Sequence, residues 1–382
     1  MHFTRIHKVI DQMISLFHRI GFWHEEERTT VSQLRIKSFY CIYHASYVSS
    51  FLIGAIKKET VDESIFLAEV SVIIAVLTIK FWMLLWKKKQ IMQLLNRVCV
   101  FSIRYDEEFT FYNDRVEKFI KFFIIFACAT MATALGCLIF PFIGNTKSLL
   151  LNIAFPFDWR NSEIGFWMAY IYFNTEMAVS ILALALSVII WYLLLQCSLR
   201  YKILGMEIQT MGRITGEGTV KMTQKEKNAI FYKDLVASIK AHLHLKEITD
   251  EVESFSSKLF LLQFATSGLC ICCSIYCNVS TNVLERLIHV YTFFYNISEL
   301  FMITYFGNEI MLSSSCLTYS LFESEWTEQP HSTKKCIIIF GEYLKRSHEM
   351  LIGKLYPLTL DTFTRILKSS YSLFNILKNT KQ

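Results

Sequence analysis

The sequence predicts an all-α membrane protein with seven transmembrane helices, and its composition and apolar stretches carry that prediction. Of the 382 residues, 53% are hydrophobic, and the mean hydropathy is +0.35, both high for a soluble chain. Only 13 glycines and 4 prolines are present, which favours long helices over a turn-rich β fold. The apolar stretches are long enough to cross a hydrocarbon core as helices, which takes about 20 residues.

The whole chain, 1–382, is treated as one seven-transmembrane domain, since no repeat or low-complexity segment divides it. The predicted spans are about 38–56, 65–85, 119–139, 167–194, 258–278, 287–311 and 356–378. Residues 195–257 are not expected to be a floppy linker, because apolar residues keep near-helical spacing from Leu235 into the fifth span. We expect 195–257 and 312–355, with a further helix near 334–349, to form a helical anchor in the cytoplasm.

Before the first span, apolar residues recur at helical spacing from Ile6 to Ile20, with Arg5, Lys8 and Arg19 between them. This pattern predicts an amphipathic helix. Such a helix either lies on a membrane surface or docks on the body of the protein, and the sequence leaves both alternatives open.

Lysine and arginine predict the orientation of the spans. Of the 39 such residues, 27 lie in the N-terminal segment and in the loops on its side of the membrane, and six lie on the other side. The positive-inside rule therefore places the N-terminus in the cytoplasm and the C-terminus outside. One glycosylation triplet, Asn278-Val279-Ser280, agrees with this orientation. A receptor that signals through G proteins has its N-terminus outside, so this orientation argues against that class.

Signals for catalysis and for cofactors are absent from the sequence. No His-Glu-x-x-His, Gly-x-Ser-x-Gly or phosphate-binding glycine loop occurs, so we expect neither an enzyme nor a cofactor. The cysteine cluster at 270–277 lacks two spaced Cys-x-x-Cys pairs, and we expect no metal there. Basic clusters sit in the cytoplasmic loops, where orientation explains them without nucleic acid.

Four charged residues inside the predicted spans are candidate functional groups, because charge is costly within the membrane. Glu69 and Lys80 lie in the second span, Glu176 in the fourth and Glu299 in the sixth. They either pair across helices or line a wet cavity, and a transporter would place the three glutamates on its translocation path. Structural pairing is the simpler interpretation.

The outer halves of the second, third, fourth and sixth spans are rich in aromatic and long aliphatic side chains. Such side chains could line an apolar pocket for a small ligand, although aromatic stripes are more often helix packing. The candidate ligand-binding residues are Phe66, Val70, Met131, Leu135, Phe173, Met177, Tyr291 and Phe294.

The last predicted span carries a polar stripe. Asp361, Arg365, Ser369, Ser372 and Asn379 fall on one side of the helix, because they are spaced three, four or seven residues apart, which is one or two helical turns. A polar stripe on a spanning helix must face protein or water. If several copies surround an axis, the candidate pore-lining residues are Arg365, Ser369, Ser372 and Ile376. Ile376 would then form an apolar ring that gates by dewetting. The alternative is packing of the stripe on the fifth and sixth spans of the same subunit.

Several longer motifs resemble those of the insect odorant receptors, over most of the chain. The most specific is GKLYPLTLDTFTRILKSSYSLFNIL at 353–377. Further matches are YFGNEIMLSSSCLTYSLFESEW at 305–326, AHLHLKEITDEVESFSSKLFLLQF at 241–264 and FPFDW at 155–159. Gustatory receptors share this architecture, but their usual Gln-Phe ending is missing here, which favours the odorant branch. Leu373 replaces a tyrosine common in the family, and Lys378 adds charge near the proposed gate.

The resemblance implies an odorant-binding subunit of a heteromeric, ligand-gated, non-selective cation channel. It implies a tetramer with a shared odorant co-receptor (Orco), with the last helix lining the pore and the cytoplasmic helices joining the subunits. It also implies that a small volatile apolar ligand binds among the outer halves of the second, third, fourth and sixth spans. The expected location is the plasma membrane of olfactory neuron dendrites, with the chain crossing the lipid several times.

Overall fold

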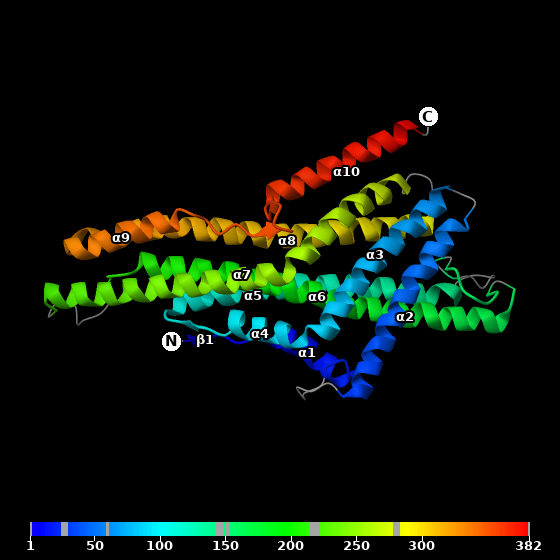
Figure 1. The fold of residues 1–382 in the computed structure, drawn as a ribbon, viewed down its shortest axis with the longest axis horizontal. Helices are drawn as coiled ribbons and strands as arrows, with labels where there is room; N and C mark the ends of the chain where they lie inside the picture. The colour runs from blue at the N-terminus through cyan, green and yellow to red at the C-terminus, as the bar shows by residue number, and fades with distance from the viewer. Residues whose placement is uncertain are drawn as a thin grey trace.

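The computed structural model confirms the all-helical fold class (Figure 1). It describes residues 2–23, 30–58, 61–142, 149, 151, 153–159, 161–213, 222–277 and 283–380. Within them the helices are α1 (Lys8–Arg19), α2 (Val31–Ile56), α3 (Val61–Trp86), α4 (Lys88–Cys99), α5 (Asp106–Ile139), α6 (Glu163–Gln209), α7 (Gln224–Cys277), α8 (Val283–Glu323), α9 (His331–Leu344) and α10 (Leu360–Thr380). Short antiparallel pairs join β1 (His2–Phe3) to β2 (Ser102–Ile103) and β3 (Leu351–Ile352) to β4 (Tyr356–Pro357).

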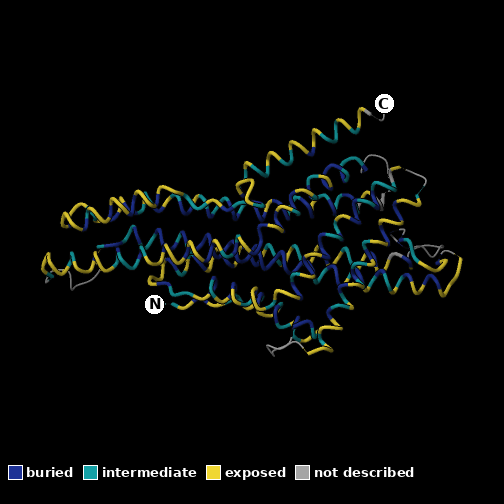
Figure 2. The backbone as a smooth tube through the Cα atoms, viewed as in Figure 1, coloured by how far each residue is buried: buried dark blue, intermediate teal, exposed yellow. Residues whose placement is uncertain are grey.

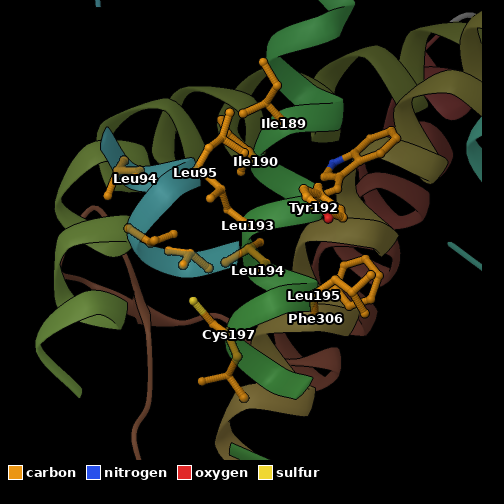
Figure 3. Packing of buried hydrophobic residues seen from close by; sticks show 14 of the residues in the cluster. Leu94, Leu95, Ile189, Ile190, Tyr192, Leu193, Leu194, Leu195, Cys197 and Phe306 are labelled. Carbon is orange, nitrogen blue, oxygen red and sulfur yellow. The ribbon is translucent and has the colours of Figure 1, made fainter. Parts of the chain in front are cut away.

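Helix α6 is the centre of the fold. Every residue from Ala183 to Leu199 is buried, as expected of a helix that is apolar on all sides. Leu94 and Leu95 of α4 and Phe306 of α8 pack in the cluster of buried side chains around it (Figure 3). The three longest helices, α6, α7 and α8, contact one another and give the molecule its length, whereas α10 projects from the body (Figure 1).

The amphipathic N-terminal helix is α1, and it docks on the body of the protein. Ile10, Ile14 and Phe17 on its apolar face are buried in the main core. The backbone N–H of His7, at the start of the helix, donates to the Tyr192 hydroxyl of α6 at 3.1 Å. Of the two alternatives left open by the sequence, the structure therefore supports docking.

The predicted spans fall on long helices, with one shifted boundary. Within the described residues, five helices are long and apolar enough to cross a membrane: α2, α3, α5, α6 and α7. Helices α8 and α10 cover the sixth and seventh predicted spans but are not among these five, so the count of seven spans stays a prediction. Helix α10 begins at Leu360 rather than at 356, because Tyr356 and Pro357 form strand β4.

Helices α6, α7 and α8 continue well beyond the predicted spans. Helix α6 ends at Gln209, α7 begins at Gln224 and α8 ends at Glu323, with α9 packed on α7 and α8. Ion pairs join this region, from Arg97 of α4 to Glu247 and Glu251 of α7. The glycosylation triplet at 278–280 lies outside the described residues.

The β3–β4 hairpin fixes the start of α10. Gly353 turns the chain with a φ of +57°, which favours glycine. Leu358 follows the hairpin and packs against Gly307 of α8 so closely that a Cβ at position 307 would lie 2.5 Å from the Leu358 carbonyl oxygen. The absence of a side chain at Gly307 thus lets the segment before α10 lie directly on α8.

Candidate functional site

A cavity of about 550 Å³ lies among α2, α3, α5, α6 and α8. Helix α3 contributes a stripe of Val70, Ile73, Ile74 and Leu77 at helical spacing. Helix α5 contributes only residues with small side chains, and this leaves the space that the cavity occupies. Its α5 lining consists of Thr130, Ala132, Thr133, Ala134, Gly136 and Cys137, and the other helices and a nearby loop add Tyr47, Leu151, Met177, Ser180, Ile181, Leu184, Ile288, Tyr291, Thr292 and Tyr295.

The lining suits a small, mainly apolar molecule. Several of its hydroxyl groups already have partners, because Thr130, Thr133 and Ser180 each donate to the backbone carbonyl four residues earlier. Tyr291 donates weakly to Thr130 at 3.5 Å. A ligand therefore meets mostly hydrocarbon with a few hydroxyl groups, which is the composition typical of small-molecule pockets.

Three of the eight candidate ligand-binding residues line this cavity: Val70, Met177 and Tyr291. Phe66 and Phe173 are buried outside it. Phe66 packs edge-on against His289, with ring centroids 4.4 Å apart. The ring centroids of Phe173 and Tyr47 are 6.3 Å apart.

The remaining three candidates, Met131, Leu135 and Phe294, are each at least 50% exposed on the surface of the chain. On α5 the cavity is lined by small residues and not by the bulky Met131 and Leu135, because only small side chains leave this space open. Tyr47 and Tyr295 also line the cavity and were not predicted. On α3 the sequence did hold a signal for the cavity lining. Val70, Ile73, Ile74 and Leu77 are apolar and recur at helical spacing, so they share the face that lines the cavity.

Each of the four buried charged residues has a polar partner on another helix, and Lys80 and Glu299 pair with each other, as the simpler interpretation expected. Lys80 of α3 donates to Glu299 of α8 at 2.9 Å, and Tyr295 donates to the same glutamate oxygen at 3.3 Å. Glu176 lies 2.7 Å from His44 Nδ1, with both side chains fully buried. Glu69 accepts from Ser274 of α7, which also contacts Thr292 of the cavity wall. Charged groups therefore lie next to the cavity, mostly behind its apolar wall.

The polar stripe of α10 is exposed. Arg365, Ser369, Ser372 and Ile376 are all exposed, and Ile376 is 60% exposed. Exposed positions recur along the whole of α10 (Figure 2). The inner face packs on α7, where Ser370 donates to the Gly268 carbonyl oxygen at 2.9 Å. Packing of the stripe on the fifth and sixth spans of the same subunit is therefore contradicted by the structure.

The helical region beyond the predicted spans carries several large apolar side chains that are exposed in this chain. Its exposed side chains are Tyr319 and Phe322 on α8 and Ile338, Ile339 and Tyr343 on α9. Large exposed apolar patches mark interaction surfaces. Nearby, burial lowers the pKa of His242 to about 4, so this histidine is neutral near pH 7.

The fold and the cavity define a multi-pass helical membrane protein with a mainly apolar cavity between its helices. The family model described as 7tm Odorant receptor matches residues 60–371, and the chain belongs to this family. Odorant receptor 94a of Drosophila melanogaster is 24% identical over 82% of this chain and 79% of its own length. Odorant receptor 23a of the same species is 26% identical over 62% and 61%.

Solved structures share the fold. The insect olfactory receptor OR5 from Machilis hrabei in complex with eugenol aligns with a TM-score of 0.76 and 15% identity, covering 98% of each chain. The same receptor in another structure aligns with a TM-score of 0.75 and 15% identity, covering 96% of this chain and 98% of that one. The resemblance to odorant receptors inferred from the motifs is thereby confirmed, and the chain is an odorant receptor rather than an enzyme.

Proposed function

We propose that this chain is the odorant-binding subunit of a heteromeric, ligand-gated, non-selective cation channel. The observation that carries the channel part is the exposed polar stripe of α10. A polar face on a membrane helix needs protein or water beside it, and Arg365, Ser369 and Ser372 lie away from the rest of their own chain. Several copies of α10 around an axis would give this stripe an aqueous path.

The ligand part of the proposal rests on the cavity. Its volume of about 550 Å³ and its apolar wall with hydroxyl groups suit a small volatile molecule. The Machilis receptor, which has the same fold, is described in complex with eugenol, a small phenol with a largely apolar body. We infer the same ligand class for this chain. Of the candidate ligand-binding residues, Val70, Met177 and Tyr291 line the cavity, and we propose that they contact the ligand.

The exposed side chains of α8 and α9 bear on which other subunits this chain contacts. The apolar side chains of α8 and α9 fit contacts between subunits, and we propose a tetramer that includes the odorant co-receptor (Orco). The excess of lysine and arginine on one side supports a cytoplasmic N-terminus and an extracellular C-terminus. We infer that the protein resides in the plasma membrane of olfactory neuron dendrites.

Two experiments test this function. The first tags the N-terminus and measures antibody access in intact and permeabilised cells; access only after permeabilisation supports the orientation, and access in intact cells contradicts it. The second records currents from cells that express the chain with the co-receptor. Volatile-evoked cation currents whose ion selectivity changes on substitution of Ser372 support the channel. Unchanged selectivity after substitution along the α10 stripe would remove α10 from the pore wall.

A further inference from the structure

A small void lies in the middle of the helical bundle, apart from the ligand cavity. Its volume is about 10 Å³, and it is enclosed by α3, α6, α7 and α8. Five polar side chains border it, and none is more than 3% exposed: Lys80, Ser187, Trp191, Gln263 and Glu299. So many polar groups around one buried void are unusual, because apolar side chains normally fill the core of a bundle.

Four of these side chains each have a polar atom without a hydrogen-bond partner in the described part of the chain. These atoms are Ser187 Oγ, Trp191 Nε1, Gln263 Oε1 and Glu299 Oε2. A buried polar atom without a partner is costly, so it needs a bound group. The indole nitrogen is a donor, the amide and carboxylate oxygens are acceptors, and the serine hydroxyl can be either. Two donors and two acceptors are what one water molecule can satisfy.

The size and charge of the void also favour water. A void of this size holds about one water molecule, which needs two to four polar partners. Lys80 Nζ lies 2.9 Å from Glu299 Oε1, so the two charges already compensate each other. A cation in the void would be repelled by the ammonium group, and an anion would be repelled by the carboxylate.

We propose that a single water molecule occupies this void and joins the four helices that enclose it. The water accepts hydrogen bonds from Trp191 Nε1–H and Ser187 Oγ–H. It donates to Gln263 Oε1 and Glu299 Oε2. This site is separate from the ligand cavity and takes no part in holding the odorant.

The water site lies on a polar route from the cavity to α10, and this step rests on the proposed channel function. On the cavity side, Tyr295 lines the wall and donates to Glu299 at 3.3 Å. On the other side, Gln263 Nε2 donates to Ser267 Oγ at 2.8 Å. The next residue, Gly268, accepts the hydrogen bond from Ser370 of α10. A ligand that moves Tyr295 therefore acts on α10 through Glu299, the water and α7.

A high-resolution cryo-EM map of the purified receptor tests the site directly. We expect one density peak at hydrogen-bond distance, about 2.7–3.2 Å, from the four polar atoms. A void without density would overturn the proposal. So would a peak with several oxygen ligands at about 2.3–2.6 Å, which is the signature of a bound calcium ion rather than water.

Paired substitutions test whether the side chains act through one shared water. Trp191→Phe removes the indole donor and Gln263→Met removes the amide oxygen, and each should lower the thermal midpoint of the purified receptor by a few degrees. If both side chains contact the same water, the thermal midpoint of the double variant falls by less than the sum of the decreases in the two single variants. Additive losses would overturn the shared site. Trp82→Phe on the exposed side of α3 is the control, and its effect should add to that of Gln263→Met.

Currents and binding together test the route to α10. The probe is eugenol or, if the receptor does not bind it, the strongest binder among small phenols and esters. In Gln263→Met we expect the half-maximal concentration for current to rise at least about fivefold, while the Kd of the purified receptor stays within about twofold. Equal changes in both quantities, or none, would overturn the route. If the unmodified receptor passes no evoked current, the proposed channel function fails and the route with it, while the map and the paired substitutions still decide the water site.

Discussion

The hydroxyl of Ser370 on α10 donates to the carbonyl oxygen of Gly268 on α7 at 2.9 Å, while its neighbour Ser369 is exposed. Two consecutive serines therefore separate the two faces of α10. A Cβ at position 268 would lie 3.6 Å from both Ile366 and Ser370, an ordinary contact distance, so α10 packs closely on α7 here.

The serine pair gives the first prediction. Ser370→Ala removes a buried hydrogen bond and should lower the free energy of unfolding by about 1 kcal/mol. Ser369→Ala should leave stability unchanged but alter the relative permeability of the channel to different cations. Thermal unfolding of purified protein and reversal potentials measure the two effects. If Ser370→Ala changes permeability and Ser369→Ala changes stability, the assignment of the two faces is reversed.

Ile376 gives the second prediction. An apolar ring blocks ions because water leaves a narrow hydrophobic constriction, so Ile376→Ser should wet the ring and raise the current without ligand. Leu373→Ser is the matched control, because Leu373 lies off the stripe and is half-buried. The measurement is the resting conductance of cells that express the receptor with the co-receptor. Equal resting conductance in wild type and Ile376→Ser would exclude Ile376 as the gate.

The ligand cavity gives the third prediction. Ala134→Phe on α5 should fill part of the cavity and weaken odorant binding by about tenfold, which corresponds to about 1.4 kcal/mol. Met131→Phe lies one turn earlier on the same helix, at a half-exposed position that does not line the cavity, and should leave binding unchanged. Thermal-shift titration of the purified receptor with the best volatile ligand measures both. A larger effect from Met131→Phe would place the ligand outside the cavity.

The helices could be predicted from the sequence, but the position of the cavity could not. The long helices could be predicted because apolar runs and helical spacing are local signals, and the continuation of α7 from Leu235 was one of them. The short helix α4 was not predicted, because its start is rich in lysine and only a few apolar residues, Ile91, Leu94 and Leu95 among them, form its buried face. The cavity depends on where neighbouring helices leave space. Nothing in the α5 sequence by itself shows that Ala134 faces the other helices while Leu135 faces outward.

His242 of α7 gives the fourth prediction. Burial lowers its pKa to about 4 from 6.5, so below pH 6.5 the unfolded chain binds a proton that the folded chain does not. The stability contribution of His242 is therefore fully present above pH 6.5 and falls as the pH drops toward 4. His242→Phe should reduce the loss of thermal stability over this range. His244→Phe is the control, because that side chain is more than half exposed. If the thermal midpoint falls equally with pH in the wild type and in His242→Phe, the prediction is contradicted.

The Lys80–Glu299 pair gives the last prediction. Both side chains are nearly fully buried, so Lys80→Met alone leaves a buried carboxylate without its counter-charge and should cost about 3–5 kcal/mol. The double variant Lys80→Met, Glu299→Leu removes both charges and should recover most of that loss, because apolar residues of similar size tolerate this environment. The thermal midpoint of the three purified proteins is the measurement. The double variant should nevertheless respond poorly to odorant, because Tyr295 loses its acceptor. Full recovery of both stability and ligand-evoked current would show that the pair is structural and plays no part in coupling the cavity to α10.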